Sequence, residues 1–201
     1  MIEHMPGFWP RRWEAAWQDR VKPVFDAVPG AYVIAGGFLR SCLLGEMEKD
    51  VDLFFASKSE LQRTRKWLEE RTGTKGKGDD GDNEVPREKS KFSRAVFDFG
   101  GRTLDLIQTG EVQFAGDMMS AFDLTCCKAA FERSGRLVLA DSFEEDCLAK
   151  RIRCDAALPP GASGGTIRRA ARLVAAGWAL SKGDAADMAE RIAQAEWGKG
   201  G

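Results

Sequence analysis

Residues 7–28 have a helical pattern of apolar and polar positions. Large apolar side chains recur every four residues, at Trp9, Trp13, Trp17 and Val21. This spacing places them on one side of an amphipathic helix. We interpret the stripe as a face that packs against a sheet or a partner chain, with stacking on nucleic-acid bases as the alternative.

The next pattern is that of a buried strand followed by a helix. The apolar run Tyr32–Ala35 predicts a strand that stops at the pair Gly36 and Gly37. Apolar residues then recur at helical spacing over 38–44, and Gly45 stands where that helix should end.

A second apolar run carries two carboxylates. Asp50 and Asp52 are two positions apart, so in a strand they point to one face, while Val51 and Leu53 point to the other. Two like charges side by side on an apolar strand are costly unless a cation lies between them. Oxygen ligands suit magnesium, and the two preceding glycines allow backbone N–H groups to approach a triphosphate at the start of a helix.

A helix, a polar stretch and a hairpin follow. Ser57 or Ser59 is placed to cap a helix that runs to about Glu70. Residues 73–91 are rich in Gly, Lys and Asp without periodicity, which predicts a mobile loop. Residues 92–108 predict a β-hairpin with Gly100 and Gly101 at the turn.

The second hairpin strand carries a third candidate carboxylate. Asp105 lies between Leu104 and Leu106, which point to the opposite face. A cross-strand partner or salt bridge is the structural alternative for Asp105. Asp98 also lies in an apolar strand, but its position just before the turn makes it the weaker candidate.

The remaining segments read as a turn region, a linker and two helices. Asp123 is either a ligand-binding residue or the N-cap of a helix over 124–132. The composition of residues 157–165 is that of a linker. Thr166 is predicted to cap a helix in which Arg168 and Arg172 lie one turn apart, and Asp184 to cap a last helix that ends at Trp197. The inward positions of the first of these helices are predicted to be Ile167, Ala170, Val174 and Trp178.

Composition narrows the classes of protein that fit these patterns. The 201 residues have 43% hydrophobic and 30% charged content, which is typical of a soluble globular chain. Thirty basic and thirty-one acidic residues give a formal charge of −1, which argues against a protein that coats nucleic acid. Five cysteines without repeated spacing indicate a reduced, cytoplasmic protein, and we expect no membrane segment. The single histidine, His4, is expected to lie in a frayed terminus, which effectively excludes histidine-based catalysis.

The two motifs together resemble the head of the DNA polymerase β-like nucleotidyltransferases. Residues 36–45, Gly-Gly-Phe-Leu-Arg-Ser-Cys-Leu-Leu-Gly, and residues 49–53, Lys-Asp-Val-Asp-Leu, follow the order of the pattern in CCA-adding enzymes and bacterial poly(A) polymerases. Residues 122–127 and 136–148 continue the resemblance, which covers about residues 30–180. Ser41, Phe122 and Cys127 stand where those enzymes usually carry Asp, Arg and Asn.

The resemblance implies a fold and a division of the chain. We expect an α+β nucleotidyltransferase fold, α/β-like in its order of elements, in which a small mixed sheet bears the three carboxylates and helices pack largely on one side. Residues 1–29 would form a helix that packs on the core, residues 30–156 the catalytic domain, and residues 157–201 a linker with a neck-like helical segment.

The resemblance also implies a magnesium-dependent transfer of a nucleoside monophosphate from an NTP, with ATP or CTP favoured, to a hydroxyl such as an RNA 3′ end. Two Mg²⁺ ions, or Mn²⁺ in their place, would be held by Asp50, Asp52 and Asp105, and Asp105 would assist deprotonation of the hydroxyl. The residues implied to bind the nucleotide are Gly36, Gly37, Arg40, Asp123, Arg168 and Arg172. The alternatives are transfer to a protein or small-molecule hydroxyl, and a binding or regulatory protein that has kept the fold and lost the reaction.

Overall fold

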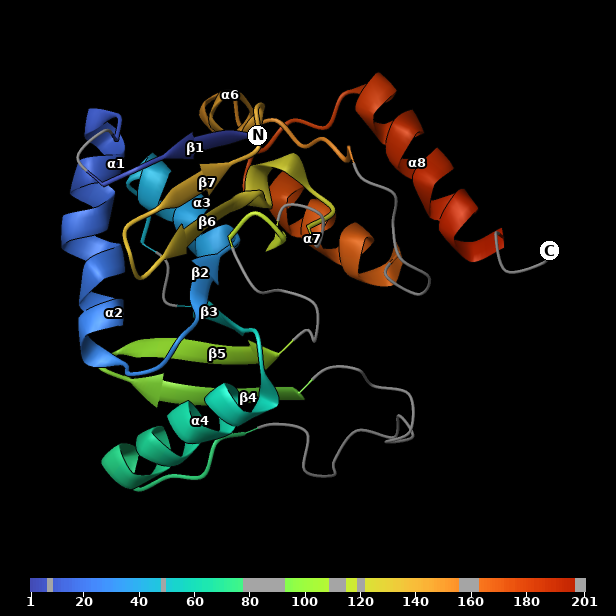
Figure 1. Cartoon of the computed structure of the whole chain (residues 1–201). Coiled ribbons are helices and arrows are strands. Elements are labelled where there is room, and N and C mark those ends of the chain that lie inside the picture. Colours follow the sequence, from blue (N-terminus) through green and yellow to red (C-terminus); the bar gives the residue numbers. More distant parts are fainter. Residues whose placement is uncertain are drawn as a thin grey trace.

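Seven strands form one mixed sheet in the part of the chain that the structure, a computed structural model, describes: residues 1–6, 9–47, 50–77, 93–108, 115–118, 122–155 and 163–197. The strands are β1 (Ile2–His4), β2 (Val33–Ala35), β3 (Asp50–Phe55), β4 (Ser93–Phe99), β5 (Arg102–Gln108), β6 (Ala129–Glu132) and β7 (Leu137–Leu139). Their order is β1-β7-β6-β2-β3-β5-β4 (Figure 1). Only the β3–β5 pairing among these is parallel. The expected α+β fold with a mixed sheet is therefore confirmed.

The helices occupy both ends and the middle of the chain. They are α1 (Arg11–Ala16), α2 (Lys22–Ala27), α3 (Gly37–Leu44), α4 (Lys58–Thr72), α6 (Phe143–Leu148), α7 (Ser163–Ala175) and α8 (Lys182–Trp197). One π-helical turn, Trp17–Val21, joins α1 to α2, so the first predicted helix is present over residues 11–27. None of the helices in the described ranges has the length and apolar character needed to cross a membrane.

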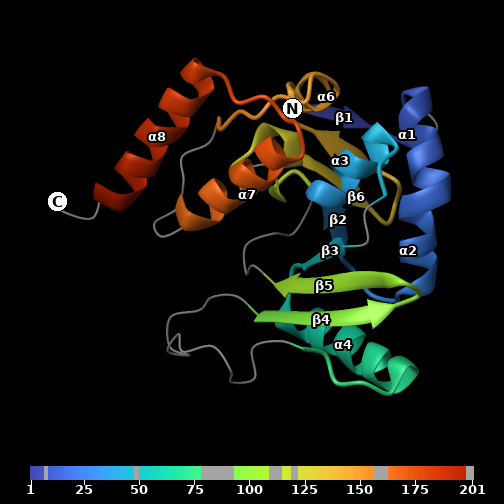
Figure 2. The ribbon, with the colours of Figure 1, turned by 180° about the vertical axis from the view of Figure 1, so that it is seen from behind.

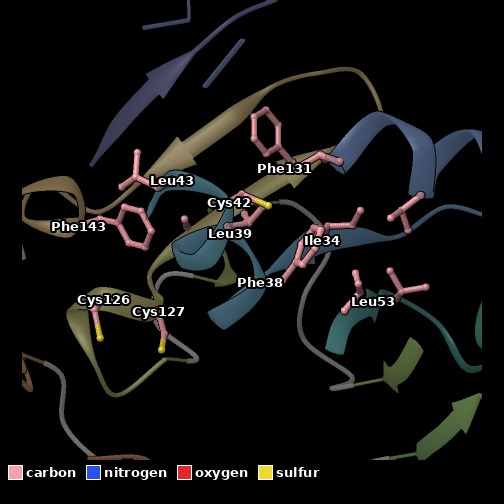
Figure 3. Close-up of a cluster of buried hydrophobic side chains, with 14 of the residues drawn as sticks. Ile34, Phe38, Leu39, Cys42, Leu43, Leu53, Cys126, Cys127, Phe131 and Phe143 are labelled. Atoms are coloured by element: carbon pink, nitrogen blue, oxygen red, sulfur yellow. The ribbon is translucent and has the colours of Figure 1, made fainter. Parts of the chain in front are cut away.

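The two faces of the sheet differ because the side chains of β3 alternate. Val51, Leu53 and Phe55 are buried in the larger apolar cluster, which also receives the inward sides of α1 to α4. Figure 3 shows part of this cluster, with Leu39 and Cys42 on α3. Asp50 and Asp52 point to the opposite face, where a smaller apolar cluster lies. The alternation thus leaves one face of β3 for the carboxylates.

The tryptophan stripe packs inside the chain. Trp13 and Trp17 are buried, and their rings lie 5.8 and 5.1 Å from that of Phe131 on β6. Trp9 precedes α1 but still contacts Trp17 at 5.2 Å. The packing interpretation of the stripe is therefore confirmed.

Two predictions about segments that form strands β1 and β6 are wrong. Ile2–His4 pairs with β7 as an edge strand, although His4 was expected in a frayed terminus. Residues 124–132 do not form a helix: a short 3₁₀ turn, Thr125–Cys127, leads into β6, which lies between β7 and β2. The run Ala129–Phe131 is buried on both faces of the sheet, so it lacks the alternation that marks a strand.

The faces of the C-terminal helices also differ from the prediction. Helix α7 begins at Ser163, and Thr166 lies inside it. Ala170 and Trp178 are buried as expected, together with Leu173, whereas Ile167 and Val174 are exposed. The hydroxyl of Ser181 accepts a hydrogen bond from the backbone N–H of Asp184, so Ser181 caps α8 in place of Asp184. Both views show α8 beyond α7, away from the sheet (Figures 1 and 2).

The predicted loop and the predicted division of the chain both stay predictions. Most of the loop, residues 78–91, lies outside the described residues, while Lys77 pairs with Val96 at the edge of β4. Residues from all three predicted segments, among them Trp13, Ile34 and Trp178, contribute to the larger cluster. The division at residues 29/30 and 156/157 stays a prediction.

Replacing Trp13 tests whether the N-terminal helix stabilises the sheet. Trp13 is fully buried, and its indole N–H donates to Glu144 at 2.7 Å. We expect Trp13→Ala to lower the free energy of unfolding in urea by about 3–5 kcal/mol, because it leaves a large cavity. Trp67→Ala is the control, since Trp67 is only half-buried and should cost clearly less. Equal losses in the two variants would contradict this role for the stripe.

Candidate active site

Gly36 forms the turn between β2 and α3. Its φ of 86° and ψ of −145° belong to a region that is essentially restricted to glycine. A Cβ atom here would lie 3.3 Å from the Phe122 ring and 3.5 Å from a carboxylate oxygen of Asp52. No side chain caps the start of α3, so its first N–H groups can serve another acceptor, such as a phosphate.

The three candidate carboxylates lie on one face of two adjacent strands. In the parallel pairing of β3 and β5, Asp50 is level with Thr103 and Asp52 is level with Asp105. Register partners project to the same side of a sheet, so the tertiary structure brings Asp52 and Asp105 side by side. Asp98 shares this face from β4, where it is level with Thr103. It is exposed, as expected for the weaker candidate.

Asp105 has a cross-strand partner. The Nε of Arg94 on β4 donates to its two carboxylate oxygens at 2.8 and 2.9 Å, and the Nη2 of Arg94 donates to Oδ2 at 2.5 Å. Asp105 itself is only 8% exposed. The cross-strand salt bridge, which is the structural alternative for Asp105, is therefore present. The catalytic role of Asp105 stays a prediction.

Asp50 and Asp52 carry the donor atoms that a divalent cation binds, whereas Asp105 already has a cationic partner. Asp50 is exposed and Asp52 half-buried, and both supply oxygen ligands on the side of the sheet next to the Gly36 turn. Because Gly36 has no side chain, no Cβ atom occupies the space beside the carboxylate of Asp52. Among the described residues, however, no three acidic, cysteine or histidine side chains are arranged to hold a metal. Metal binding by Asp50, Asp52 and Asp105 stays a prediction.

Arg40 lies across the start of α3. A Cβ atom on Gly37 would lie 3.4 Å from its Nη2. Its Nη1 donates to the sulfur of Cys127 at 3.6 Å, and its guanidinium carbon lies 5.5 Å from the centre of the Trp178 ring. The cation is thereby held beside the glycine turn, and its predicted contact with phosphates remains a prediction.

Phe122 lies beside the glycine turn, and Cys127 lies beside Arg40. The ring of Phe122 meets Phe54 edge to face at 5.8 Å and approaches Gly36. The neighbouring Cys126, and after it the Arg40 guanidinium, hold the pKa of the Cys127 thiol below its usual value despite burial. Figure 3 shows the two adjacent cysteines together on their turn. An apolar ring and a thiol therefore stand where the resembled enzymes carry Arg and Asn.

Asp123 binds α7 to the body of the fold. It accepts hydrogen bonds from the Thr166 hydroxyl at 2.5 Å, from the Arg169 guanidinium, and from the backbone N–H of Leu124 at 2.9 Å. Burial alone would raise the pKa of this carboxyl, but the bonds from Arg169 and Thr166 hold it below its usual value. Asp123 is thus a structural anchor, and its predicted role at the nucleotide was not tested.

Arg169 is the arginine of α7 that reaches this anchor. Arg168 and Arg172, the two arginines singled out in the sequence, are exposed, and their contact with a nucleotide stays a prediction. The signal that could have found Arg169 is its position three residues after Thr166 and one before the buried Ala170, on the inward side of the helix.

A second buried carboxylate braces the same region. Asp146 on α6 is fully buried, accepts a hydrogen bond from the Thr125 hydroxyl at 2.5 Å, and accepts one from the Nε of Arg153 at 2.9 Å. It thereby joins α6 to the turn that carries Cys126 and Cys127.

Comparisons with known proteins agree with this geometry. A family model described as "Gad2: Gabija anti-defense 2 family protein" matches residues 17–150, more than half of the chain. No curated protein matches the chain significantly.

Solved structures of CCA-adding enzymes share the fold. The Thermotoga maritima CCA-adding enzyme complexed with tRNA has a TM-score of 0.58 at 18% identity, over 97% of this chain and 46% of the enzyme. A CCA-adding enzyme with CTP gives 0.56 at 19% identity, over 97% and 45%. A tRNA nucleotidyltransferase with a primer tRNA and an ATP analogue gives 0.55 at 21% identity, over 87% and 49%. The chain spans less than half the length of these enzymes. The resemblance to polymerase β-like nucleotidyltransferases is confirmed for the fold.

Substituting Gly36 tests the turn that positions the site. We expect Gly36→Ala to destabilise the protein by about 2 kcal/mol, because its backbone region excludes Cβ and the new methyl meets Phe122. Gly45→Ala, at the other end of α3, is the matched control. Gly45 has a φ of 70° but open space around it, so alanine should cost about 1 kcal/mol from backbone strain alone. Thermal unfolding of both variants provides the measurement, and a larger loss at Gly45 would contradict the assignment.

The Asp123 anchor predicts a specific dependence of stability on pH. Because the pKa of Asp123 is lowered in the folded state, its ionised form stabilises the fold above the unfolded pKa of about 3.9. This stabilisation is lost as the pH falls through the folded pKa. We expect Asp123→Asn to lower the free energy of unfolding by about 1–3 kcal/mol at pH 7, and the difference from the unmodified protein to shrink below about pH 4.

Urea unfolding between pH 3 and pH 7 measures this difference. The control is Asp141→Asn, which removes an exposed carboxylate paired with the N-terminus and should change stability little at any of these pH values. A difference for Asp123→Asn that is constant down to pH 3 would show that the charge of Asp123 is not what anchors α7.

Proposed function

We propose that this chain, which belongs to the Gabija anti-defense 2 family, transfers a nucleoside monophosphate from an NTP to a hydroxyl acceptor and releases pyrophosphate. The observation that carries the proposal is the alignment of Asp52 with Asp105 in the parallel β3–β5 pair, next to a glycine turn that starts a helix. The shared fold of the CCA-adding enzymes, which bind tRNA, ATP or CTP, supports it.

The Gly36–Gly37 turn would bind the triphosphate. Its backbone approaches without side-chain obstruction, and the uncapped N-terminus of α3 favours an anion. Arg40, held beside this turn by Cys127 and Trp178, would offset the charge of the phosphates. These contacts would hold the leaving pyrophosphate in place.

Asp50 and Asp52 would hold a divalent ion, Mg²⁺ or Mn²⁺, that supplies charge compensation and polarises the phosphate under attack. The acceptor oxygen forms a bond to the α-phosphorus, the bond to the bridging oxygen breaks, and pyrophosphate leaves with that oxygen. Asp105 would orient the acceptor hydroxyl and help to remove its proton. Arg94 makes three hydrogen bonds to Asp105. A carboxylate has roughly four lone-pair directions, so one remains for the acceptor hydroxyl.

The proposed reaction requires only that the acceptor carries a hydroxyl group. An RNA 3′ end is the acceptor that the fold favours, and the name of the family adds the components of the Gabija defence as candidate acceptors. Incubation of the protein with labelled NTPs and either RNA or those components, followed by mass spectrometry, identifies the acceptor by its mass increase of one nucleoside monophosphate.

A nucleotide-binding regulator without transferase activity is the second candidate. The observation in its favour is the engagement of Asp105 by Arg94, together with Phe122 in place of an arginine. Pyrophosphate release distinguishes the two functions: the regulator binds NTP and releases none.

Replacing the metal-binding candidates tests the proposed transfer. We expect Asp50→Asn and Asp52→Asn each to lower the rate of pyrophosphate release by about 100-fold or more, because each removes half of the charge that holds the ion. The fold should be unchanged or slightly stabilised, since two crowded negative charges are separated. The matched control is Asp98→Asn on the same face, which should retain most activity. Near-normal turnover of either first variant at saturating Mg²⁺ would rule out this assignment.

A further inference from the structure

The hairpin β4–β5 places an arginine on the carboxylate face of the sheet. Val96 is the register partner of Asp105 across the hairpin, and Arg94 is two residues before Val96. Residues two apart in a strand point to the same side, so Arg94 projects from the same face as Asp105 and Asp52. Its position is thus a consequence of strand register.

The contact between Arg94 and Asp105 engages both oxygens of the carboxylate. The three donor–acceptor distances are 2.8, 2.9 and 2.5 Å. Asp105 is buried and needs a cation, whereas the Arg94 side chain is 60% exposed. Arginine suits this role because its planar guanidinium matches a carboxylate and remains charged at any physiological pH.

This contact limits what Asp105 can bind. A divalent ion at Asp105 would compete with Arg94, whose three hydrogen bonds use most of the lone-pair directions of the carboxylate, and its double charge would lie within a few ångströms of the guanidinium. Asp50 on the same face is exposed, Asp52 is half-buried, and the turn at Gly36 lies beside Asp52.

We propose that Arg94 takes the place of a second metal ion at Asp105, so that this site holds a single divalent ion, between Asp50 and Asp52. The inference rests on the proposed nucleotidyl transfer for its biological meaning. Arg94 is a positioning residue in this arrangement: it neutralises Asp105 and fixes the orientation of its carboxylate beside Asp52. Through Arg94 the protein therefore supplies positive charge where a two-metal site binds its second ion from solution.

Counting bound Mn²⁺ tests the inference without reference to activity. Titration of the protein with Mn²⁺ alone, followed by the electron paramagnetic resonance signal of free Mn²⁺, should give about one ion per chain. Arg94→Gln should bind about two, because Asp105 is released, and Arg94→Gln with Asp105→Asn should return to about one. Arg94→Lys should stay near one, since it keeps the repelling charge.

Controls separate this inference from the proposed function. Arg102→Gln removes the same charge from the same hairpin, but Arg102 points to the opposite face, where it donates to the carbonyl of Arg20, so its count should stay at one. Circular dichroism of each variant verifies folding before the titration. Two ions in the unmodified protein, or no gain in folded Arg94→Gln, would overturn the inference and leave the transfer intact. No Mn²⁺ binding at all would overturn both.

Discussion

The parallel pairing of β3 with β5 is the constraint on which the site depends. It sets Asp52 level with Asp105 on one side of an otherwise apolar sheet, and two adjacent carboxylates are tolerated there only with compensating charge. Arg94 answers this need at Asp105, with which it pairs, while the glycine turn lies beside Asp52. On the opposite face of β3, the apolar side chains of Val51, Leu53 and Phe55 are buried in the main core and need no compensating charge.

Buried ion pairs perform a different task on the other side of the site. Asp123 pairs with Arg169 of α7, and Asp146, which pairs with Arg153, also accepts a hydrogen bond from Thr125 of the turn that carries Cys126 and Cys127. Removal of one partner from such a pair leaves a buried charge without compensation, which makes these contacts specific for one arrangement. Helix α7 is thereby attached to the same turn that contacts Arg40.

This chain, which shares the fold of the CCA-adding enzymes, carries three distinctive contacts around its central carboxylates and glycine turn. Phe122 presents an aromatic edge to the glycine turn, Cys127 a thiol to Arg40, and Arg94 a guanidinium to Asp105. A fold can host several chemistries because its backbone positions the site and its side chains decide the reaction. In this protein the parallel strands and the glycine turn place Asp52 beside Asp105 and Gly36, and Arg94 supplies the charge that balances Asp105.

Local patterns in the sequence determined the tryptophan face, the glycine turn, the two-residue spacing of Asp50 and Asp52, and the β4–β5 hairpin, because each depends on residues a few positions apart. Only the tertiary structure decided which residues meet across strands and helices. Arg94 reaches Asp105, and Arg169 reaches Asp123, through strand register and helix orientation, which a linear pattern does not contain. Ala129–Phe131 became a strand in place of a helix because pairing with β2 and β7 outweighed local helical preference.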